Sequence, residues 1–200
     1  MENKLETLFE SADRYFKQGS FLESLFCYRD ALQNPDVSDR GLELAYWGAG
    51  ESLMNLGLFY EAIAYLKQAI KHNDQDYNYY YLLADCYLKL LQPKEAQKCL
   101  AKSLDIKPNH PELLRCLGWS YILEKKNREG INLLKKSLSF EENNLRTLCD
   151  LAVAYMNLHN HRQSQIIIEK AKKISPQDPM VLDIEAANKH FGAAYRQLTK

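Results

Sequence analysis

Two pairs of side chains in this sequence have the types and spacing that metal or thiol chemistry needs. His159 and His161 flank a single residue at a predicted turn between helices, and two turn imidazoles can bind a metal ion. No Asp, Glu or Cys lies close in sequence to complete that site. Cys116 and Cys149 fall at adjacent places on neighbouring predicted helices, where their thiols could approach each other. We interpret the histidines as an exposed turn and the cysteines as small buried hydrophobes, and expect no metal and no cofactor.

Longer catalytic signatures are absent from the sequence. It contains no Gly-rich phosphate loop, no Cys-x-x-Cys pair and no His-Glu-x-x-His. The sequence therefore predicts a protein that is not an enzyme, and a hydrolase or redox enzyme is kept only as a third hypothesis.

The composition limits the classes of partner. The chain has 200 residues, of which 46% are hydrophobic and 26% charged, as in an ordinary folded domain. Its 26 basic and 26 acidic side chains cancel, which removes the long-range attraction of a generic nucleic-acid or membrane binder. The sequence has no apolar run of about 18 residues and no secretory signal at its start. With five widely spaced cysteines, these features predict a cytoplasmic protein that binds neither nucleic acid nor membrane.

The sequence repeats itself at an interval of 34 residues. Tyr87, Tyr121 and Tyr155 coincide at this offset, and the series extends back, with a four-residue insertion, to repeats that start at Glu43 and Leu5. Three places in every repeat hold only Ala, Gly or Ser, which allows helix backbones to approach closely. Repeat by repeat, these residues are Ala12, Ser24 and Ala31; Gly50, Ala62 and Ala69; Ala84, Ala96 and Ser103; Gly118, Gly130 and Ser137; and Ala152, Ser164 and Ala171.

Each repeat has the pattern of two helices joined by a tight turn. Apolar residues recur at helical spacing, as at Tyr80, Leu83, Ala84 and Tyr87. Breaks fall inside the repeats, as at Gly57, and again between them. No segment alternates in the way that strands do, so the sequence predicts an all-α protein.

The repeat resembles the tetratricopeptide repeat. Residues 80–87 match the first-helix pattern of that family, and Ala96 and Pro108 match its second helix. The resemblance covers roughly residues 5–178 and implies a right-handed superhelical α-solenoid that forms a single domain over residues 1–200. The five helix-turn-helix repeats that it implies span about residues 5–38, 43–76, 77–110, 111–144 and 145–178.

One further helix is predicted at about residues 179–198. Apolar residues form a stripe along it at Met180, Ile184, Ala187, Phe191, Ala194 and Leu198. The stripe has two interpretations: a cap over the last repeat, which solenoids need for solubility, or a homodimer seam, because the same spacing suits a coiled coil.

By resemblance to the family, the first helices of the repeats line a concave groove that binds a partner. The groove positions are those left over once the packing positions are removed. They predict a peptide-binding site formed by Phe9, Asp13, Trp47, Glu51, Asn55, Tyr81, Asp85, Arg115, Trp119 and Arg146.

Both tryptophans of the chain fall in this set. The core positions beside them are already filled, so Trp47 and Trp119 are interpreted as binding anchors with a large contact area. The alternative is that both rings pack against neighbouring helices and expose only an edge. For an exposed anchor, Trp47→Ala is expected to change the free energy of unfolding by ~1 kcal/mol or less.

Charge along the predicted groove is uneven. Carboxylates such as Glu51 and Asp85 lie in its amino-terminal half, whereas Arg115 and Arg146 lie in the carboxy-terminal half. This distribution predicts a protein or peptide partner with apolar and basic residues, and two arginines that take an acidic group. The alternative is a mixed surface that faces solvent.

Lysines form a second charged feature, on the second helices. Lys94, Lys98 and Lys102 lie four residues apart, and Lys135 and Lys136 follow one repeat later. We interpret them as a solvated surface, with an anionic partner as the alternative.

The leading functional prediction is a non-enzymatic adaptor or scaffold that holds an extended peptide or a partner helix in the groove. One alternative is a structural scaffold that self-associates as a homodimer through residues 179–198. Another is a secretion-type chaperone for a translocated protein, although neutral charge and five repeats are unlike that group.

Overall fold

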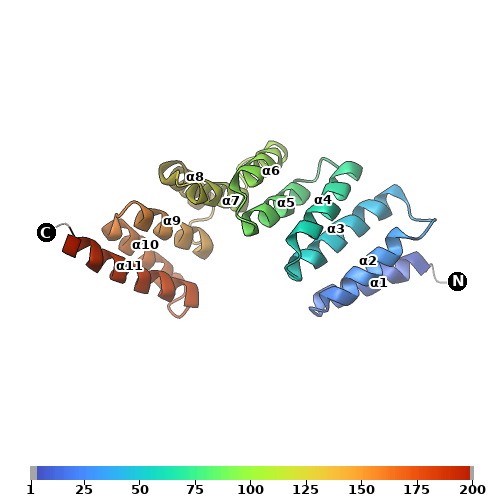
Figure 1. The fold of residues 1–200 in the computed structure, drawn as a ribbon, viewed down its shortest axis with the longest axis horizontal. Coiled ribbons are helices and arrows are strands. Elements are labelled where there is room, and N and C mark those ends of the chain that lie inside the picture. The colour runs from blue at the N-terminus through green and yellow to red at the C-terminus, as the bar shows by residue number, and fades with distance from the viewer. Residues whose placement is uncertain (1–3, 199–200) are drawn as a thin grey trace. The chain divides into compact units, whose positions relative to one another are not determined.

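A computed structural model describes the backbone of residues 4–198 and the side chains of residues 4–194. This part of the chain folds into eleven α-helices and contains no strand, which confirms the all-α prediction (Figure 1). The helices are α1 (Lys4–Lys17), α2 (Phe21–Leu32), α3 (Asp39–Asn55), α4 (Phe59–His72), α5 (Tyr77–Lys89), α6 (Pro93–Ile106), α7 (Pro111–Leu123), α8 (Asn127–Phe140), α9 (Leu145–Asn157), α10 (His161–Ile174) and α11 (Pro179–Leu198).

The first ten helices form five pairs, each closed by the same type of turn. Two residues after its end, the first helix of every pair is followed by a residue with left-handed backbone, such as Gly57 at φ 76° or His159 at φ 55°. The next amide then donates back to a carbonyl five residues earlier, as from Leu58 to Leu53 at 2.9 Å. This is the Schellman arrangement, in which glycine is the usual left-handed residue. His159 therefore provides the left-handed residue of its turn, and its side chain is exposed.

The small residues of the repeat lie where paired helices touch. A Cβ atom on Gly130 would lie 2.7 Å from the carbonyl oxygen of Gly118, so the backbones of α7 and α8 are in contact there. Ser at the last small position also makes a specific bond. Ser103 Oγ donates to the carbonyl of Tyr77 at 2.8 Å, and Ser137 Oγ donates to the carbonyl of Pro111 at 2.8 Å. Each serine thus anchors the start of the first helix in its pair.

The chain divides into two compact parts, an N-terminal half (residues 1–108) and a C-terminal half (residues 109–200). The N-terminal half contains α1–α6, and its core includes Leu25, Leu53, Leu66 and Leu83. The C-terminal half contains α7–α11, and its core is formed by residues such as Leu134, Leu148, Leu151, Ile168 and Val181. The single domain expected from the sequence stays a prediction.

Helix α11 packs on α9 and α10, but only part of the predicted apolar stripe takes part, because Ile184 packs on the core while other members of the stripe are exposed. Met180 and Phe191 of that stripe are 40% and 56% exposed, and the side chain of Leu198 lies outside the described residues. The buried face instead holds Val181 together with two polar residues, Glu185 and Asn188. An apolar periodicity could not reveal this face, because polar residues occupy buried positions on it.

The polar residues on the buried face of α11 have partners. Glu185 receives hydrogen bonds from Lys172 at 3.1 Å and forms an ion pair with Lys189 at 2.9 Å. These two lysines hold the pKa of the Glu185 carboxyl below its ordinary value. Asn188 Nδ2 donates to the carbonyl of His161 at 3.2 Å. The helix is therefore held by directed hydrogen bonds as well as by apolar contact.

Candidate functional site

The ten predicted groove residues all lie on the first helices of the pairs. Helix α3 contacts both α1 and α5, so the groove residues of the N-terminal half lie on three neighbouring helices. We call these residues the aromatic–acidic surface: Phe9, Asp13, Trp47, Glu51, Asn55, Tyr81 and Asp85. Arg115 and Trp119 on α7 and Arg146 on α9 belong to the C-terminal half.

The aromatic rings of the aromatic–acidic surface are partly buried. Phe9, Trp47 and Tyr81 all pack against the core of the N-terminal half. The Phe9 ring lies edge-on to Tyr28, with centroids 6.2 Å apart, and the Trp47 ring lies 6.3 Å from that of Tyr79. Trp47 Nε1 is buried and has no hydrogen-bond partner among the described residues. Trp47 therefore combines the two interpretations offered by the sequence, because its ring packs on the core and keeps an exposed part.

The carboxylates of this surface recur at one place of the repeat, at Asp13, Glu51 and Asp85. Asp13 Oδ1 accepts a hydrogen bond from the Tyr28 hydroxyl at 2.7 Å. The side chain of Glu51 is half-buried, and in the described part of the chain its carboxylate has no hydrogen bond or ion pair. Burial raises the pKa of the Glu51 carboxyl from 4.5 to about 7. Glu51 is thus a carboxylate that has lost water without gaining a protein partner.

Asn55, one helical turn beyond Glu51, is exposed and bonded to its own helix. Its Nδ2 donates to the backbone carbonyl of Glu51 at 2.9 Å. This bond uses only the Nδ2 group of Asn55. The amide oxygen of the same side chain can therefore accept a hydrogen bond from a partner while the side chain keeps its position.

Glu43, a buried carboxylate outside this set, supports the aromatic–acidic surface from inside the fold. Glu43 is 4% exposed and accepts hydrogen bonds from the Tyr79 hydroxyl at 2.7 Å, from Asn73 at 2.9 Å and from Arg40. Burial alone would raise the pKa of Glu43, but these hydrogen bonds outweigh it and hold the pKa below 4.5. Because Tyr79 packs against Trp47, the Glu43 bonds fix the ring behind Trp47. Sequence reasoning missed Glu43, since a lone glutamate at the start of a repeat gives no sign of burial.

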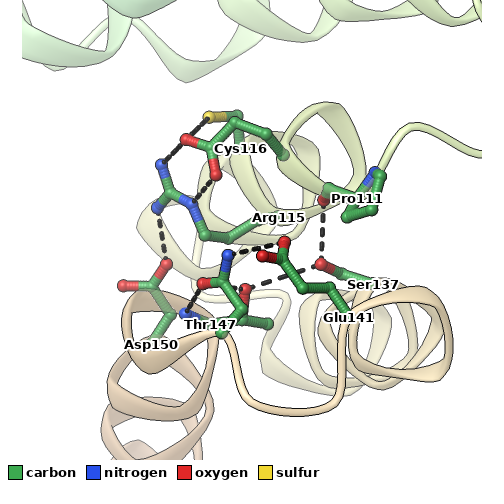
Figure 2. A network of polar contacts seen from close by, with 9 residues as sticks. Pro111, Arg115, Cys116, Ser137, Glu141, Thr147 and Asp150 are labelled. Carbon is green, nitrogen blue, oxygen red and sulfur yellow. Dashed lines mark hydrogen bonds and ion pairs between the residues drawn. The ribbon is translucent and has the colours of Figure 1, made fainter. Parts of the chain in front are cut away.

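The corresponding region of the C-terminal half contains an ion-pair network rather than a free carboxylate. Arg115 Nε and Nη2 donate to both carboxylate oxygens of Glu112, at 2.9 and 2.6 Å, and Nη1 donates to Asp150 Oδ2 at 2.8 Å. Figure 2 shows the Arg115 guanidinium pointing toward the Asp150 carboxylate, with a dashed line for their hydrogen bond. The Arg115 side chain is only 14% exposed, and the network joins α7 to α9. We call Glu112, Arg115 and Asp150 the arginine network.

The arginine network is electrostatically closed. Burial raises the pKa of Asp150, and the neighbouring Arg115 offsets only part of that rise. Burial would lower the pKa of Arg115, but its hydrogen bonds to Glu112 and the charge of the nearby carboxylates raise it instead. Two negative charges surround one positive charge. Arg115 would therefore have to leave these partners before it could bind an acidic group, whereas Arg146 is exposed.

A second set of hydrogen bonds near the arginine network fixes the start of α9. Asn144 Oδ1 accepts from both the amide and the hydroxyl of Thr147, each at 2.9 Å, and Asn144 Nδ2 donates to Glu141 at 2.9 Å. Ser137 Oγ lies 3.5 Å from the Thr147 hydroxyl (Figure 2). This is an N-cap with a side-chain extension, and it holds α9 in register with α8. Trp119 on α7 is half-buried against the core of the C-terminal half.

The pairs that suggested metal or thiol chemistry lie in different surroundings. The ring of His161 approaches Asn188 Oδ1 at 3.0 Å, and the His159 and His161 rings are 6.3 Å apart. Among the described residues, no group of three or more His, Cys, Asp or Glu could hold a metal ion. All five cysteines are free thiols, and burial raises the pKa of Cys149 to about 12. A thiol with such a pKa is protonated at neutral pH and is a weak nucleophile.

Within residues 4–198, no helix is both long enough and apolar enough to cross a membrane.

Two proteins with curated names share sequence similarity with most of this chain. Anaphase-promoting complex subunit 3 of Schizosaccharomyces pombe is 24% identical over 191 residues, which cover 94% of this chain and 27% of that protein. The BBSome complex member BBS4 of Bos taurus is 28% identical over 142 residues, which cover 70% of this chain and 26% of that protein. The chain thus spans about a quarter of the length of either relative.

Solved structures share the fold at low sequence identity. A tetratricopeptide repeat protein from Parabacteroides merdae has a TM-score of 0.82 at 18% identity, over 94% of this chain and 73% of that one. MamA from Desulfovibrio magneticus has a TM-score of 0.77 at 18% identity, over 90% and 99% of the two chains. YrrB, described as a repeat protein with an unusual peptide-binding site, has a TM-score of 0.70 at 20% identity, over 90% of each chain.

Family profiles agree with the repeat found in the sequence and with the helix pairs. Profiles described as Tetratricopeptide repeat match residues 53–117 and residues 145–178. One match lies mainly on α4–α6, and the other covers α9 and α10. Together with the 34-residue period and the all-helical fold, these matches show that the chain belongs to the tetratricopeptide repeat family.

Proposed function

We propose that this chain is a non-enzymatic adaptor that binds a segment of a partner protein on its aromatic–acidic surface. The observation that carries the proposal is Glu51, a half-buried carboxylate without a side-chain partner, one helical turn from the half-buried ring of Trp47. A partner with a Lys or Arg beside an apolar residue would supply the missing charge to Glu51 and cover the exposed part of Trp47.

The family supports an adaptor role, and the chemistry of the site narrows the partner. Tetratricopeptide repeat proteins are generally interaction modules without catalytic activity, and YrrB is described as having a peptide-binding site. In this chain Asp13, Glu51 and Asp85 recur along neighbouring helices, which favours a partner segment with basic residues. The arginine network keeps its own carboxylates, so Arg146 is the better candidate for an acidic group on the partner.

The proposal predicts that partner binding is linked to a proton. Free Glu51 is partly protonated near neutral pH because burial raises its pKa to about 7. A partner cation next to Glu51 favours the ionised carboxylate, so binding releases a proton and affinity rises as the pH rises through 7.

The test is a selection of peptides from a displayed random library, followed by calorimetry on the full chain. We expect the selected peptides to combine Lys or Arg with apolar residues, and to bind more tightly at pH 8 than at pH 6. Glu51→Gln should remove that pH dependence and weaken binding about tenfold, as expected for the loss of one partly buried charge pair. Glu61→Gln, at an exposed carboxylate on α4, is the matched control and should behave as wild type.

Two results would contradict this proposal. One is a set of peptides whose binding is unchanged in both Glu51→Gln and Trp47→Ala. The other is a set of peptides whose binding is weakened as much by Glu61→Gln as by Glu51→Gln.

Self-association is the second candidate function, and one observation favours it. Met180 and Phe191 of α11, two members of the predicted apolar stripe, are 40% and 56% exposed, so their side chains are left largely uncovered. Sedimentation of the full chain and of Phe191→Asp tests this candidate. A dimer that dissociates in the variant would favour the self-associating scaffold, and a wild-type monomer at high concentration would exclude it.

Two further expectations from the sequence concern location and an alternative role. A cytoplasmic location is part of the proposal, because five free thiols suit a reducing compartment. The secretion-type chaperone for a translocated protein stays an alternative prediction from the sequence.

A further inference from the structure

A groove on the C-terminal half is lined by none of the predicted peptide-site residues. It runs between α8 and α10, which both pack on α9 and, within the described residues, do not contact each other. The volume of the groove is about 970 Å³. Side chains of α9 line its floor, and its two walls are α8 and α10, the second helices of neighbouring pairs.

The floor and one rim of this groove are apolar. Leu148, Leu151 and Ile167 lie at its base, where they are almost fully buried. Tyr155 is half-buried above them, and Ile174 at the rim is 42% exposed. A partner segment could therefore bury apolar side chains there without any rearrangement of the helices.

The rim of the groove is basic. Lys135 on α8 and Lys170 and Lys173 on α10 line it and are exposed, while Glu142 is the only lining carboxylate in the described chain. In the part of the chain that the structure describes, none of the three lysines forms an ion pair. Lys135 instead lies over the ring of Tyr155, with its Nζ 5.8 Å from the ring centroid.

Lys172, which lies between Lys170 and Lys173 in the sequence, differs from them in having an ion-pair partner. Lys172 points toward α11 and forms an ion pair with Glu185 at 3.1 Å. Lys170 and Lys173 on the same helix line the groove, where Glu142 is the only lining carboxylate among the described residues and forms an ion pair with neither lysine. The positive charge of α10 is therefore paired on the side that packs on α11 and unpaired on the side of the groove.

The geometry points to a second interaction surface: the groove between α8 and α10 binds an acidic amphipathic segment of a partner protein. Apolar side chains of that segment would cover Tyr155 and Ile174, and its Asp or Glu residues would pair with Lys135, Lys170 and Lys173. A basic segment is excluded by repulsion from the same lysines. This surface is independent of the aromatic–acidic surface, which selects the opposite charge.

The test uses the full chain and a displayed library of random peptides of about 16 residues, which is about four helical turns. We expect a class of clones rich in Asp or Glu and in Leu, Ile or Phe. Binding of a synthetic peptide of this class should fall at least about tenfold in the double variant Lys170→Glu, Lys173→Glu, and should weaken as salt increases.

Matched variants separate the groove from general electrostatics. The double variant Lys102→Glu, Lys136→Glu makes the same change of net charge at exposed lysines outside the groove, and should retain binding. Ile174→Ser should weaken binding without changing the charge. If the glutamate variant unfolds, as judged by circular dichroism, Lys170→Gln, Lys173→Gln replaces it with a smaller loss in the same direction.

Several outcomes would overturn the inference. These are an absence of acidic clones, equal loss of binding in the groove variant and the control, or loss in Glu51→Gln instead. Binding of single-stranded DNA or of vesicles of anionic lipid through these lysines, without any acidic peptide, would also overturn it. Because the aromatic–acidic surface is tested with Glu51→Gln and Trp47→Ala, either surface can fail while the other stands.

Discussion

The two halves of the chain place opposite chemistry at equivalent positions of one repeat. In the N-terminal half, Phe9, Trp47 and Tyr81 are each followed four residues later by a carboxylate. In the C-terminal half the same two positions hold Arg115 with Trp119, and Cys149 with Val153. Glu51 has no side-chain partner, whereas Arg115 is bonded to two carboxylates. The same repeat backbone thus carries an unpaired carboxylate in the N-terminal half and a fully paired arginine in the C-terminal half.

This difference separates binding from stability. A charge already paired within the protein contributes mainly to holding its helices together, and its removal leaves partly buried carboxylates behind. A desolvated carboxylate without a partner destabilises the folded state until something binds it. The arginine network should therefore matter most for folding, and Glu51 for recognition.

The largest expected effect is that of Arg115→Ala. The substitution leaves Glu112 and Asp150 facing each other on α7 and α9 without their shared cation. We expect a loss of about 2–3 kcal/mol in the free energy of unfolding, measured by urea titration. Arg146→Ala, at an exposed arginine on α9, is the control and should be close to neutral. A loss for Arg115→Ala no larger than that of the control would remove the distinction between the halves.

Trp47→Ala comes next and acts on both properties. For an exposed ring the sequence predicts a loss of ~1 kcal/mol or less in the free energy of unfolding. Because the ring packs on the core, we expect a larger loss of about 2 kcal/mol. Trp119→Ala should lose a similar amount, because Trp119 packs on the other core. Thermal melting measures both losses. Only Trp47→Ala should also weaken a basic peptide selected on the full chain, and equal weakening by both variants would contradict a site centred on the N-terminal half.

Glu51→Gln is expected to be stabilising, with a definite pH dependence. Because burial raises the folded-state pKa of Glu51 to about 7, the folded protein keeps a proton that the unfolded chain releases above pH 4.5. The free energy of unfolding of the wild type therefore falls between pH 4.5 and 7 and levels off above. Urea titrations at several pH values should show the variant more stable by about 1–2 kcal/mol at pH 8 and equal near pH 4. Equal stabilities at pH 8 would mean that Glu51 is well solvated.

The smallest expected effect is that of Lys98→Ala. Lys98 bonds Glu95 at 2.8 Å, but its side chain is 71% exposed, so water screens the pair. We expect no measurable change in melting temperature. A clear drop would show that exposed and half-buried ion pairs do not differ here as the Arg115 prediction requires.

The sequence predicted most of the fold because the repeat shows every rule five times. Leu91, Lys125 and His159 have the left-handed backbone of Gly19 and Gly57 and occupy the same place in the repeat, although their residue types give no sign of it. Close contact at small residues, as between Gly118 and Gly130, follows from the same alignment. Repetition thus replaces the local signals that single turns lack.

Features outside the repeat could not be predicted in the same way. The buried face of α11 depends on Glu185 and Asn188, whose partners lie on α10. The link from Arg115 to Asp150 joins residues on different helices, and only the spacing from Glu112 to Arg115 hinted at an ion pair. The surroundings of Glu51 likewise come from other helices of the N-terminal half, so neither its burial nor its pKa can be inferred from neighbours in sequence.

The central claim is that Glu51 is a desolvated carboxylate that receives a cation from the partner. The most direct measurement is an NMR titration of the Glu51 side-chain carboxyl carbon, with and without a selected basic peptide. The account predicts a pKa near 7 in the free protein, which falls when the peptide binds. A pKa near 4.5 in the free protein, unchanged by the peptide, would contradict it.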